Sequence, residues 1–197
     1  MDRALVLLGR AGDAPDAALE ELLAALPYGR RLALEARDAA ARQASLAGIA
    51  LALAALTRLC GSPVRATGLA FPQDGKPALP GGPDFSITHA GAAVGVAAVP
   101  VGRVGFDLEP LVDAADRARL ERWTAIEAVL KAAGRGLRDA AAVELSPALD
   151  AGRLAGRGYR LQPVDAGEGH VARLATMPGP VNVEIERVDL SALSGPF

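Results

Sequence analysis

The sequence has a single cysteine, Cys60, so no internal disulfide can form. Cys60 follows an apolar stretch with helical spacing, and we expect it to be a buried structural thiol rather than a nucleophile. Basic residues are not in excess: 21 lysines and arginines stand against 23 aspartates and glutamates, for a net charge of −2. This balance argues against nucleic acid as the main partner.

Long hydrophobic runs are also missing. The longest, residues 46–56, is too short to span a lipid bilayer. The start, Met1-Asp2-Arg3, precedes only the apolar stretch 4–8, which is too short for a signal sequence. We therefore expect a cytoplasmic protein that does not insert into a membrane.

Alanine and leucine carry most of the 51% hydrophobic content, which favours helices. The 197 residues suffice for one good core or for two small halves packed together. Hydrophobic periodicity predicts helices at 15–26, 30–59 and 111–131, and strands at 4–8, 67–71, 85–89, 92–99, 104–108, 159–164, 170–176 and 181–188. The connections predict that 159–164 and 170–176 form a hairpin, and that 92–99 and 104–108 form a hairpin or lie close together.

Four charged residues in the second half could form a metal site. Asp107 and Glu109 end a predicted strand, and because alternate strand residues share a face, both carboxylates should point the same way. Glu127 and Lys131 are four residues apart in a helical pattern and should share a helix face. Three carboxylates brought together repel unless a cation lies among them, and such hard oxygen ligands suit Mg²⁺. Lys131 would then supply positive charge for a substrate phosphate.

Each part of this pattern also has a simpler interpretation. Asp107 and Glu109 could be a solvated strand edge. Glu127 is the fourth residue of Thr124-Ala-Ile-Glu127, a capping-box pattern, so it could cap a helix. Glu127 and Lys131 could also be an ordinary surface pair, worth about 0.3–0.5 kcal/mol. The residues alone leave these alternatives open.

Four segments occur in the order found in 4′-phosphopantetheinyl transferases of the Sfp-like type, and the chain resembles that family over roughly residues 28 to 137. They are Gly75-Lys76-Pro77, Phe85-Ser-Ile-Thr-His89, Val104-Gly-Phe-Asp-Leu-Glu109 and Trp123-Thr-x-x-Glu-Ala-x-x-Lys131. The resemblance implies an α+β pseudo-dimer of two similar halves, 1–103 and 104–197, with coenzyme A bound between them. We expect it to act as a monomer.

The resemblance also implies an activity and a metal centre. The enzyme would transfer phosphopantetheine from coenzyme A to a serine of an acyl or peptidyl carrier protein. Asp107, Glu109 and Glu127 would hold Mg²⁺ against the pyrophosphate. Glu127 would be the base for the carrier serine, and Lys131 would stabilise the charge on the leaving 3′,5′-ADP.

Further residues are implied to bind coenzyme A. Arg42 in the basic helix would contact the 3′-phosphate. Lys76 and Pro77 belong to a loop that would pack on the adenine nucleotide. Thr88 and His89 would orient the pyrophosphate.

The chain also departs from the family pattern. Thr88-His89-Ala90 stands where Ser-His-Ser is usual, and Ile126 stands where lysine usually precedes the glutamate. Only 13 residues, 110–122, separate Glu109 from Trp123, where the family carries a longer segment. These departures motivate an alternative hypothesis: a catalytically weak homologue that binds coenzyme A or a carrier protein.

Overall fold

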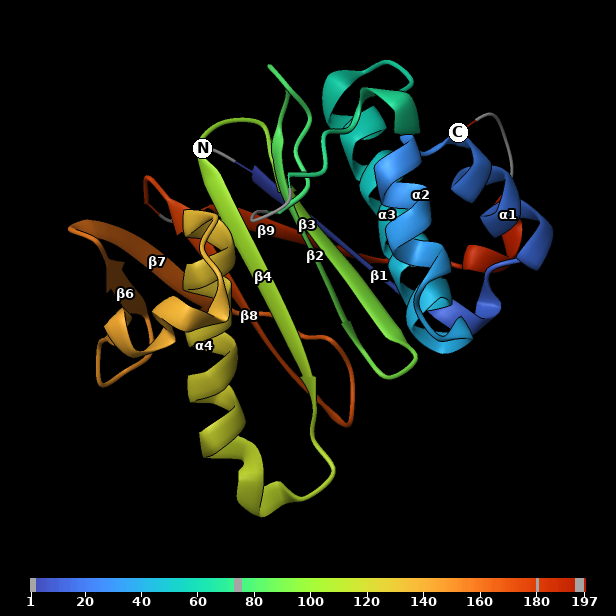
Figure 1. The fold of residues 1–197 in the computed structure, drawn as a ribbon. Helices are drawn as coiled ribbons and strands as arrows, with labels where there is room; N and C mark the ends of the chain where they lie inside the picture. The colour runs from blue at the N-terminus through green and yellow to red at the C-terminus, as the bar shows by residue number, and fades with distance from the viewer. Residues whose placement is uncertain (1–2, 73–75, 180, 194–196) are drawn as a thin grey trace.

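The computed structural model describes residues 3–72, 76–179, 181–193 and 197, and within them it shows a mixed α+β fold with two sheets (Figure 1). The helices are α1 (Asp16–Ala25), α2 (Tyr28–Glu35), α3 (Ala39–Cys60) and α4 (Arg117–Ala133). The strands are β1 (Arg3–Arg10), β2 (Asp84–Ala90), β3 (Ala93–Val99), β4 (Arg103–Pro110), β5 (Glu144–Leu145), β6 (Ala151–Leu154), β7 (Arg157–Pro163), β8 (His170–Met177) and β9 (Asn182–Arg187). The predicted α+β class is therefore confirmed.

The two sheets share a pattern of connection. One sheet has the strand order β2-β3-β1-β9 and the other β4-β8-β7-β6-β5. In each, a strand precedes a long helix (α3 or α4), and a later antiparallel hairpin (β2–β3 or β7–β8) returns beside that strand. Its last strand then pairs with the first, as β3 does with β1 and β8 with β4. Strand β9 pairs in parallel with β1, so the last strand of the chain completes the first sheet.

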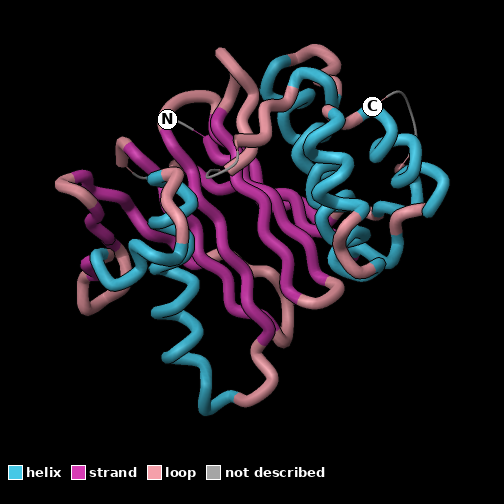
Figure 2. Tube along the Cα trace, viewed as in Figure 1, coloured by secondary structure: helices cyan, strands magenta, loops and turns pink. Residues whose placement is uncertain are grey.

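The sheets pack face to face and the helices cover their outer faces (Figure 2). Along β1, Leu5 and Leu7 join the cluster formed with α3, whereas Val6 joins the cluster between the sheets. Phe106 of β4 enters that same inter-sheet cluster. This alternation follows from the period of two along a strand.

Helix α4 lies unusually close to β4. A Cβ atom added at Gly105 would be 1.9 Å from the carbonyl oxygen of Ala128 and 2.4 Å from the backbone nitrogen of Ala132. Only glycine permits this approach of strand and helix backbones. It brings residues 127–131 of α4 next to the end of β4.

Two sequence-based predictions about the N-terminal half are wrong. The single helix predicted over 30–59 is two helices. The first ends at Glu35, and Asp38 caps the second by accepting a hydrogen bond from the Ala41 amide at 2.8 Å. Cys60, expected to be buried, is exposed at the end of α3, where Gly61 adopts a left-handed C-cap with φ 66°.

One strand prediction also needs correction, and one that left two alternatives open is decided. Residues 67–71 are not a strand: Ala66–Gly68 form a 3₁₀ turn, and Ala70 makes an isolated bridge to Ala78. Strands β3 and β4 are not a hairpin, since β4 pairs with β8. They are close neighbours, because a Cβ added at Gly95 would lie 2.6 Å from the Phe106 ring. The predicted hairpin of 159–164 with 170–176 is confirmed as β7–β8.

Among the described helices, α3 is long and apolar enough to cross a membrane by length and composition, with a mean hydropathy of 1.5. However, 67% of its most apolar window is buried inside the fold. Its faces contact α1, β1, β2 and β3, which is the packing of a core helix.

Candidate metal centre

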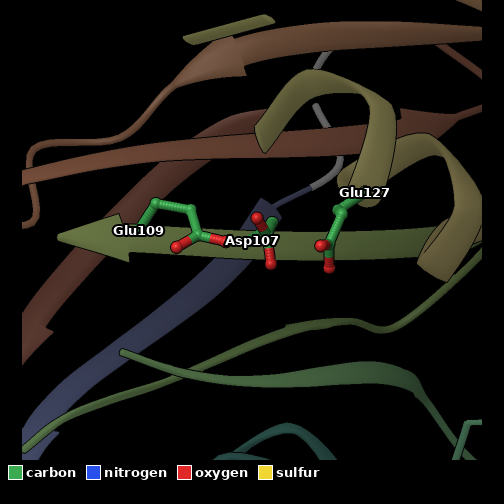
Figure 3. A group of neighbouring side chains, drawn as sticks. All are labelled: Asp107, Glu109 and Glu127. Atoms are coloured by element: carbon green, nitrogen blue, oxygen red, sulfur yellow. The ribbon is translucent and has the colours of Figure 1, made fainter. Parts of the chain in front are cut away.

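Strand β4 and helix α4 bring three carboxylates together at one end of β4 (Figure 3). One oxygen each of Asp107, Glu109 and Glu127 lies within 4.8 Å of the others. The predicted alternation along the strand is confirmed, since the side chains of Asp107 and Glu109 both point toward Glu127 of α4. Figure 3 shows Asp107 between the two glutamates.

Asp107 is the buried member of the cluster, with only 2% of its surface exposed. Its Oδ1 accepts hydrogen bonds from the Lys131 ammonium at 2.5 Å and from the Thr88 hydroxyl at 3.2 Å. Its Oδ2 is buried and has no hydrogen-bond partner among the described residues. The solvated-edge interpretation is therefore wrong for Asp107. A buried carboxylate oxygen without a partner is costly unless a ligand or ion satisfies it.

Glu127 is not a helix cap. Helix α4 begins at Arg117, and Thr124 lies within it, where its hydroxyl donates to the Leu120 carbonyl at 2.9 Å. Glu127 also differs from an ordinary surface residue, since its side chain is 18% exposed and lies 3.6 Å from the Lys131 ammonium. Its position on α4 aims it at Asp107.

The ionised forms of Glu109 and Glu127 are destabilised in this centre. Burial, followed by repulsion from Asp107, raises the pKa of Glu127 above its ordinary value, and Lys131 only partly offsets this. Burial and the charge of Asp107 likewise raise the pKa of Glu109, against a hydrogen bond from Trp123. A divalent cation among the three carboxylates would reverse this repulsion.

The donor set fits a hard cation. The three side chains offer only oxygen ligands, which suit Mg²⁺, Mn²⁺ or Ca²⁺ rather than zinc or copper. The unpartnered Oδ2 of Asp107 supplies an oxygen that no described protein donor satisfies. The acidic triad could therefore hold a metal ion.

The structure brings some of the predicted coenzyme A residues to this centre. Thr88 lies beside the ion pair of Asp107 and Lys131, with its hydroxyl 3.2 Å from Asp107 Oδ1 and 3.3 Å from the ammonium. His89 follows at the surface, where partial burial and then the charges of Lys131 and Arg37 lower its pKa.

Lys76 and Pro77 lie at the junction of β2 and β4, and Gly75 of the same motif is outside the described residues. The Lys76 ammonium donates to Asp84 at 2.6 Å and to the Val104 carbonyl at 2.7 Å. Only 13% of the Lys76 side chain is exposed, and burial lowers its pKa. Its described contacts thus join the two sheets. Pro77, half-buried, continues the same segment.

Arg42 lies in a groove between α1 and α3, together with the acidic residues Asp16 and Glu20. Two other arginines, Arg37 and Arg30, are not among the residues that line this groove. Arg37 bonds to Ser45 at 3.0 Å and is close enough to His89 to lower the pKa of that ring. The resemblance implied Arg42 for the 3′-phosphate contact. The break between α2 and α3, which the helical periodicity did not predict, separates Arg37 from the helix that carries Arg42.

Arg30 lines a second groove of about 640 Å³ between α2 and residues 69–72. Its guanidinium stacks on the Phe71 ring, 5.1 Å from the centroid. Its Nε is buried without a partner among the described residues, and burial followed by the charge of Arg37 lowers its pKa. Lys131, His89, Arg37 and Arg30 thus form a succession of basic side chains leading from the carboxylates to this groove.

The chain matches no protein-family model and no curated protein. The centre itself offers three oxygen donors, a buried carboxylate oxygen without a partner among the described residues, and basic residues beside them.

Proposed function

We propose that this protein is a Mg²⁺-dependent 4′-phosphopantetheinyl transferase that modifies a serine of an acyl or peptidyl carrier protein. The observation that carries the proposal is the Asp107–Glu109–Glu127 cluster, with the unpartnered Oδ2 of Asp107, beside Lys131. The four sequence segments that resemble the Sfp-like transferases supply the reaction, and three of them contribute side chains to this centre. It would work in the cytoplasm.

The arrangement of the sheets supports the pseudo-dimer that the resemblance implies. Each half would be one strand, one long helix and a returning hairpin, built on α3 and on α4. Thr88 and His89 come from the first unit, whereas the carboxylates and Lys131 come from the second. A ligand bound at this junction would contact both halves.

The chemistry divides among few residues. Asp107, Glu109 and Glu127 would hold Mg²⁺, which when bound neutralises charge on the pyrophosphate of coenzyme A. The carrier serine oxygen forms a bond to the β-phosphorus, and the bond from that phosphorus to the bridging oxygen breaks, releasing 3′,5′-ADP. Glu127, which lies beside Asp107 and Lys131, would accept the serine proton, and Lys131 would stabilise the leaving phosphate.

The basic side chains outline a path for coenzyme A. Its pyrophosphate would lie near Lys131 and His89, and its 3′-phosphate near Arg37 and Arg30. The groove beside Phe71 would take the adenine, since it combines an aromatic ring with a cation.

The direct test is the intact mass of a panel of apo carrier proteins after incubation with the protein, coenzyme A and Mg²⁺. We expect at least one carrier to gain the mass of phosphopantetheine. Omission of Mg²⁺ with EDTA should abolish the gain, and so should Glu127→Gln. A panel without any mass gain, under conditions where coenzyme A binds, would overturn the transferase assignment.

A second candidate is a coenzyme A-binding or carrier-binding module with little catalytic activity. It is favoured by one observation: Ile126, which replaces the family's usual lysine, is half-buried and packs on the core under α4. Binding of coenzyme A without transfer to any carrier distinguishes this candidate from the enzyme.

A further inference from the structure

Strands β2 and β4 are joined by side chains instead of a backbone ladder. Alternate residues of β2, namely Asp84, Ser86 and Thr88, contact β4, and we call them the β2 side-chain ladder. Asp84 accepts a hydrogen bond from the Val104 amide at 2.8 Å. Ser86 accepts one from the Phe106 amide at 3.0 Å.

Thr88 is the last rung of this ladder. Asp84 and Ser86 accept hydrogen bonds from backbone amides of β4, whereas the hydrogen-bond partner of Thr88 on β4 is a side chain. Its hydroxyl lies 3.2 Å from Oδ1 of Asp107 and 3.3 Å from the Lys131 ammonium. A hydroxyl has one hydrogen to donate. Asp107 as an anion can only accept and Lys131 can only donate, so Thr88 donates to the carboxylate and accepts from the ammonium.

Two consequences follow from this assignment. The Thr88 donor is used by Asp107 and is not free for a phosphate oxygen of a ligand. Both donors to Asp107 are on Oδ1, which fixes the carboxylate rotation and leaves Oδ2 unpartnered among the described residues. Thr88 itself is 4% exposed, so water cannot readily replace its hydroxyl.

We propose that Thr88 is a positioning residue that fixes Asp107 so that Oδ2 is presented to a divalent cation. This inference rests on the metal site of the proposed function but not on phosphopantetheine transfer. The resemblance implies that Thr88 contacts the pyrophosphate directly. The positioning role is proposed in place of that contact. Hydrogen-bond partners of metal ligands typically change metal affinity by about 10–100-fold when removed.

The test compares metal affinity in the full-length protein and three variants, by calorimetric titration with Mg²⁺ and with Mn²⁺. Thr88→Val keeps the shape but removes the hydroxyl, and Thr88→Ser keeps the hydroxyl. We expect Thr88→Val to bind both metals roughly tenfold or more weakly and Thr88→Ser to bind nearly as wild type does. Ser86→Ala, which removes another rung without touching Asp107, should lower stability but leave metal affinity unchanged.

A measurement without metal tests the contact between Thr88 and Asp107 independently of metal binding. A double-mutant cycle on unfolding with Thr88→Val and Asp107→Asn, in EDTA, should show coupling between the two side chains. Equal metal affinity in wild type and Thr88→Val overturns the positioning role while leaving the metal site intact. Absence of metal binding by wild type overturns the metal site of the proposed function, and the positioning role with it. Loss of affinity in Ser86→Ala equal to that in Thr88→Val would show that the whole interface, not Thr88, sets the site.

Discussion

At the scale of single residues, the centre is organised by the two oxygens of Asp107. Oδ1 faces the ammonium of Lys131 and the hydroxyl of Thr88, and Oδ2 faces neither. Lys131 therefore supplies in this structure part of the positive charge that a metal would add. A bound cation would share the carboxylates with Lys131 and leave the ammonium freer to contact a phosphate.

The first prediction concerns Asp107→Ala. It should abolish metal-induced thermal stabilisation and transfer, because the most buried ligand is lost. The fold should persist for two reasons. Lys131 keeps its ion pair with Glu127 at 3.6 Å and is 26% exposed, so its charge stays paired and partly solvated. Repulsion among the carboxylates also falls when one of them is removed. Thermal melts with and without Mg²⁺, together with carrier mass, measure this. The matched control is Glu144→Gln, an exposed carboxylate outside the cluster. Unaltered turnover in Asp107→Ala would refute the metal assignment.

The second prediction concerns pH. The folded pKa of Glu109 lies above its ordinary value of 4.5, so its ionisation destabilises the metal-free fold once the pH rises through that folded pKa. Glu109→Gln should therefore be more stable than wild type at pH 7 in EDTA. The advantage should shrink as the pH falls and disappear below the unfolded pKa, where both states bind the proton. With Mg²⁺ at pH 7 the order should reverse, because wild type gains binding energy.

Denaturant unfolding at a series of pH values, with EDTA or Mg²⁺, provides the measurement. The hydrogen bond from Trp123 opposes the shift in the pKa of Glu109, so the size of the effect reports how far burial outweighs it. A metal-free Glu109→Gln that is less stable than wild type at pH 7 would contradict the raised pKa.

At the scale of elements, the close approach of β4 and α4 aligns the carboxylates. The strand supplies Asp107 and Glu109, the helix supplies Glu127 and Lys131, and Gly105 sets the distance between them. A change in this distance would move the ligands relative to one another without altering any of them.

The third prediction is that Gly105→Ala costs on the order of 3 kcal/mol of stability and weakens metal binding, because its Cβ would overlap the α4 backbone at Ala128. Chemical denaturation and metal titration test both effects. Gly158→Ala is the matched control, since a Cβ at Gly158 meets nothing within 4 Å. If Gly105→Ala and Gly158→Ala behave alike, the strand–helix contact does not set the site.

The fourth prediction concerns Ile126, on the face of α4 that contacts its core. Ile126→Lys should lower stability by about 1–3 kcal/mol, because a lysine there must bury its charge or leave the packed surface to reach water. Wild type should already transfer phosphopantetheine, since Lys131 is in place beside the carboxylates. One melt and one carrier assay on the two proteins decide this. An inactive wild type and an active Ile126→Lys would establish the weak-homologue alternative.

The elements that hold the carboxylate cluster could be predicted from the sequence, but most contacts between those elements could not. Alternation along β4 and the four-residue spacing on α4 are local, so they place Asp107, Glu109 and Glu127 correctly. The contact of Thr88 with Asp107 joins residues 19 positions apart, and no local period reports it. The pairing of β9 with β1 is equally non-local.

At the scale of the whole molecule, the proposed ligand path crosses the junction between the two sheets. Lys131 belongs to α4, which packs against β4 and β8, whereas His89 lies on β2, Arg30 lies in α2 and Arg37 follows α2. Lys76 bonds to Asp84 on one side of the junction and to the Val104 carbonyl on the other. A ligand that spans these residues should stabilise both halves together.

The last prediction is therefore made on thermal stability. Coenzyme A with Mg²⁺ should raise the melting temperature, because a ligand that binds only the folded state stabilises it by mass action. Dephospho-coenzyme A should raise it less, since it lacks the 3′-phosphate that the basic residues of the first half would contact. Melting curves with both ligands measure the difference.

Two arginine variants locate the source of that difference. Arg37 lies close enough to His89 to lower the pKa of that ring, whereas Arg42 lines a different groove, together with Asp16 and Glu20. Arg37→Ala should therefore remove most of the difference between the two ligands, and Arg42→Ala should preserve it. The opposite result would assign the 3′-phosphate to Arg42, as the family resemblance implies. The two ligands differ only in the 3′-phosphate, so any contact with that phosphate must appear as a difference between their melting-temperature shifts. Equal shifts in wild type would therefore show that neither arginine contacts the 3′-phosphate.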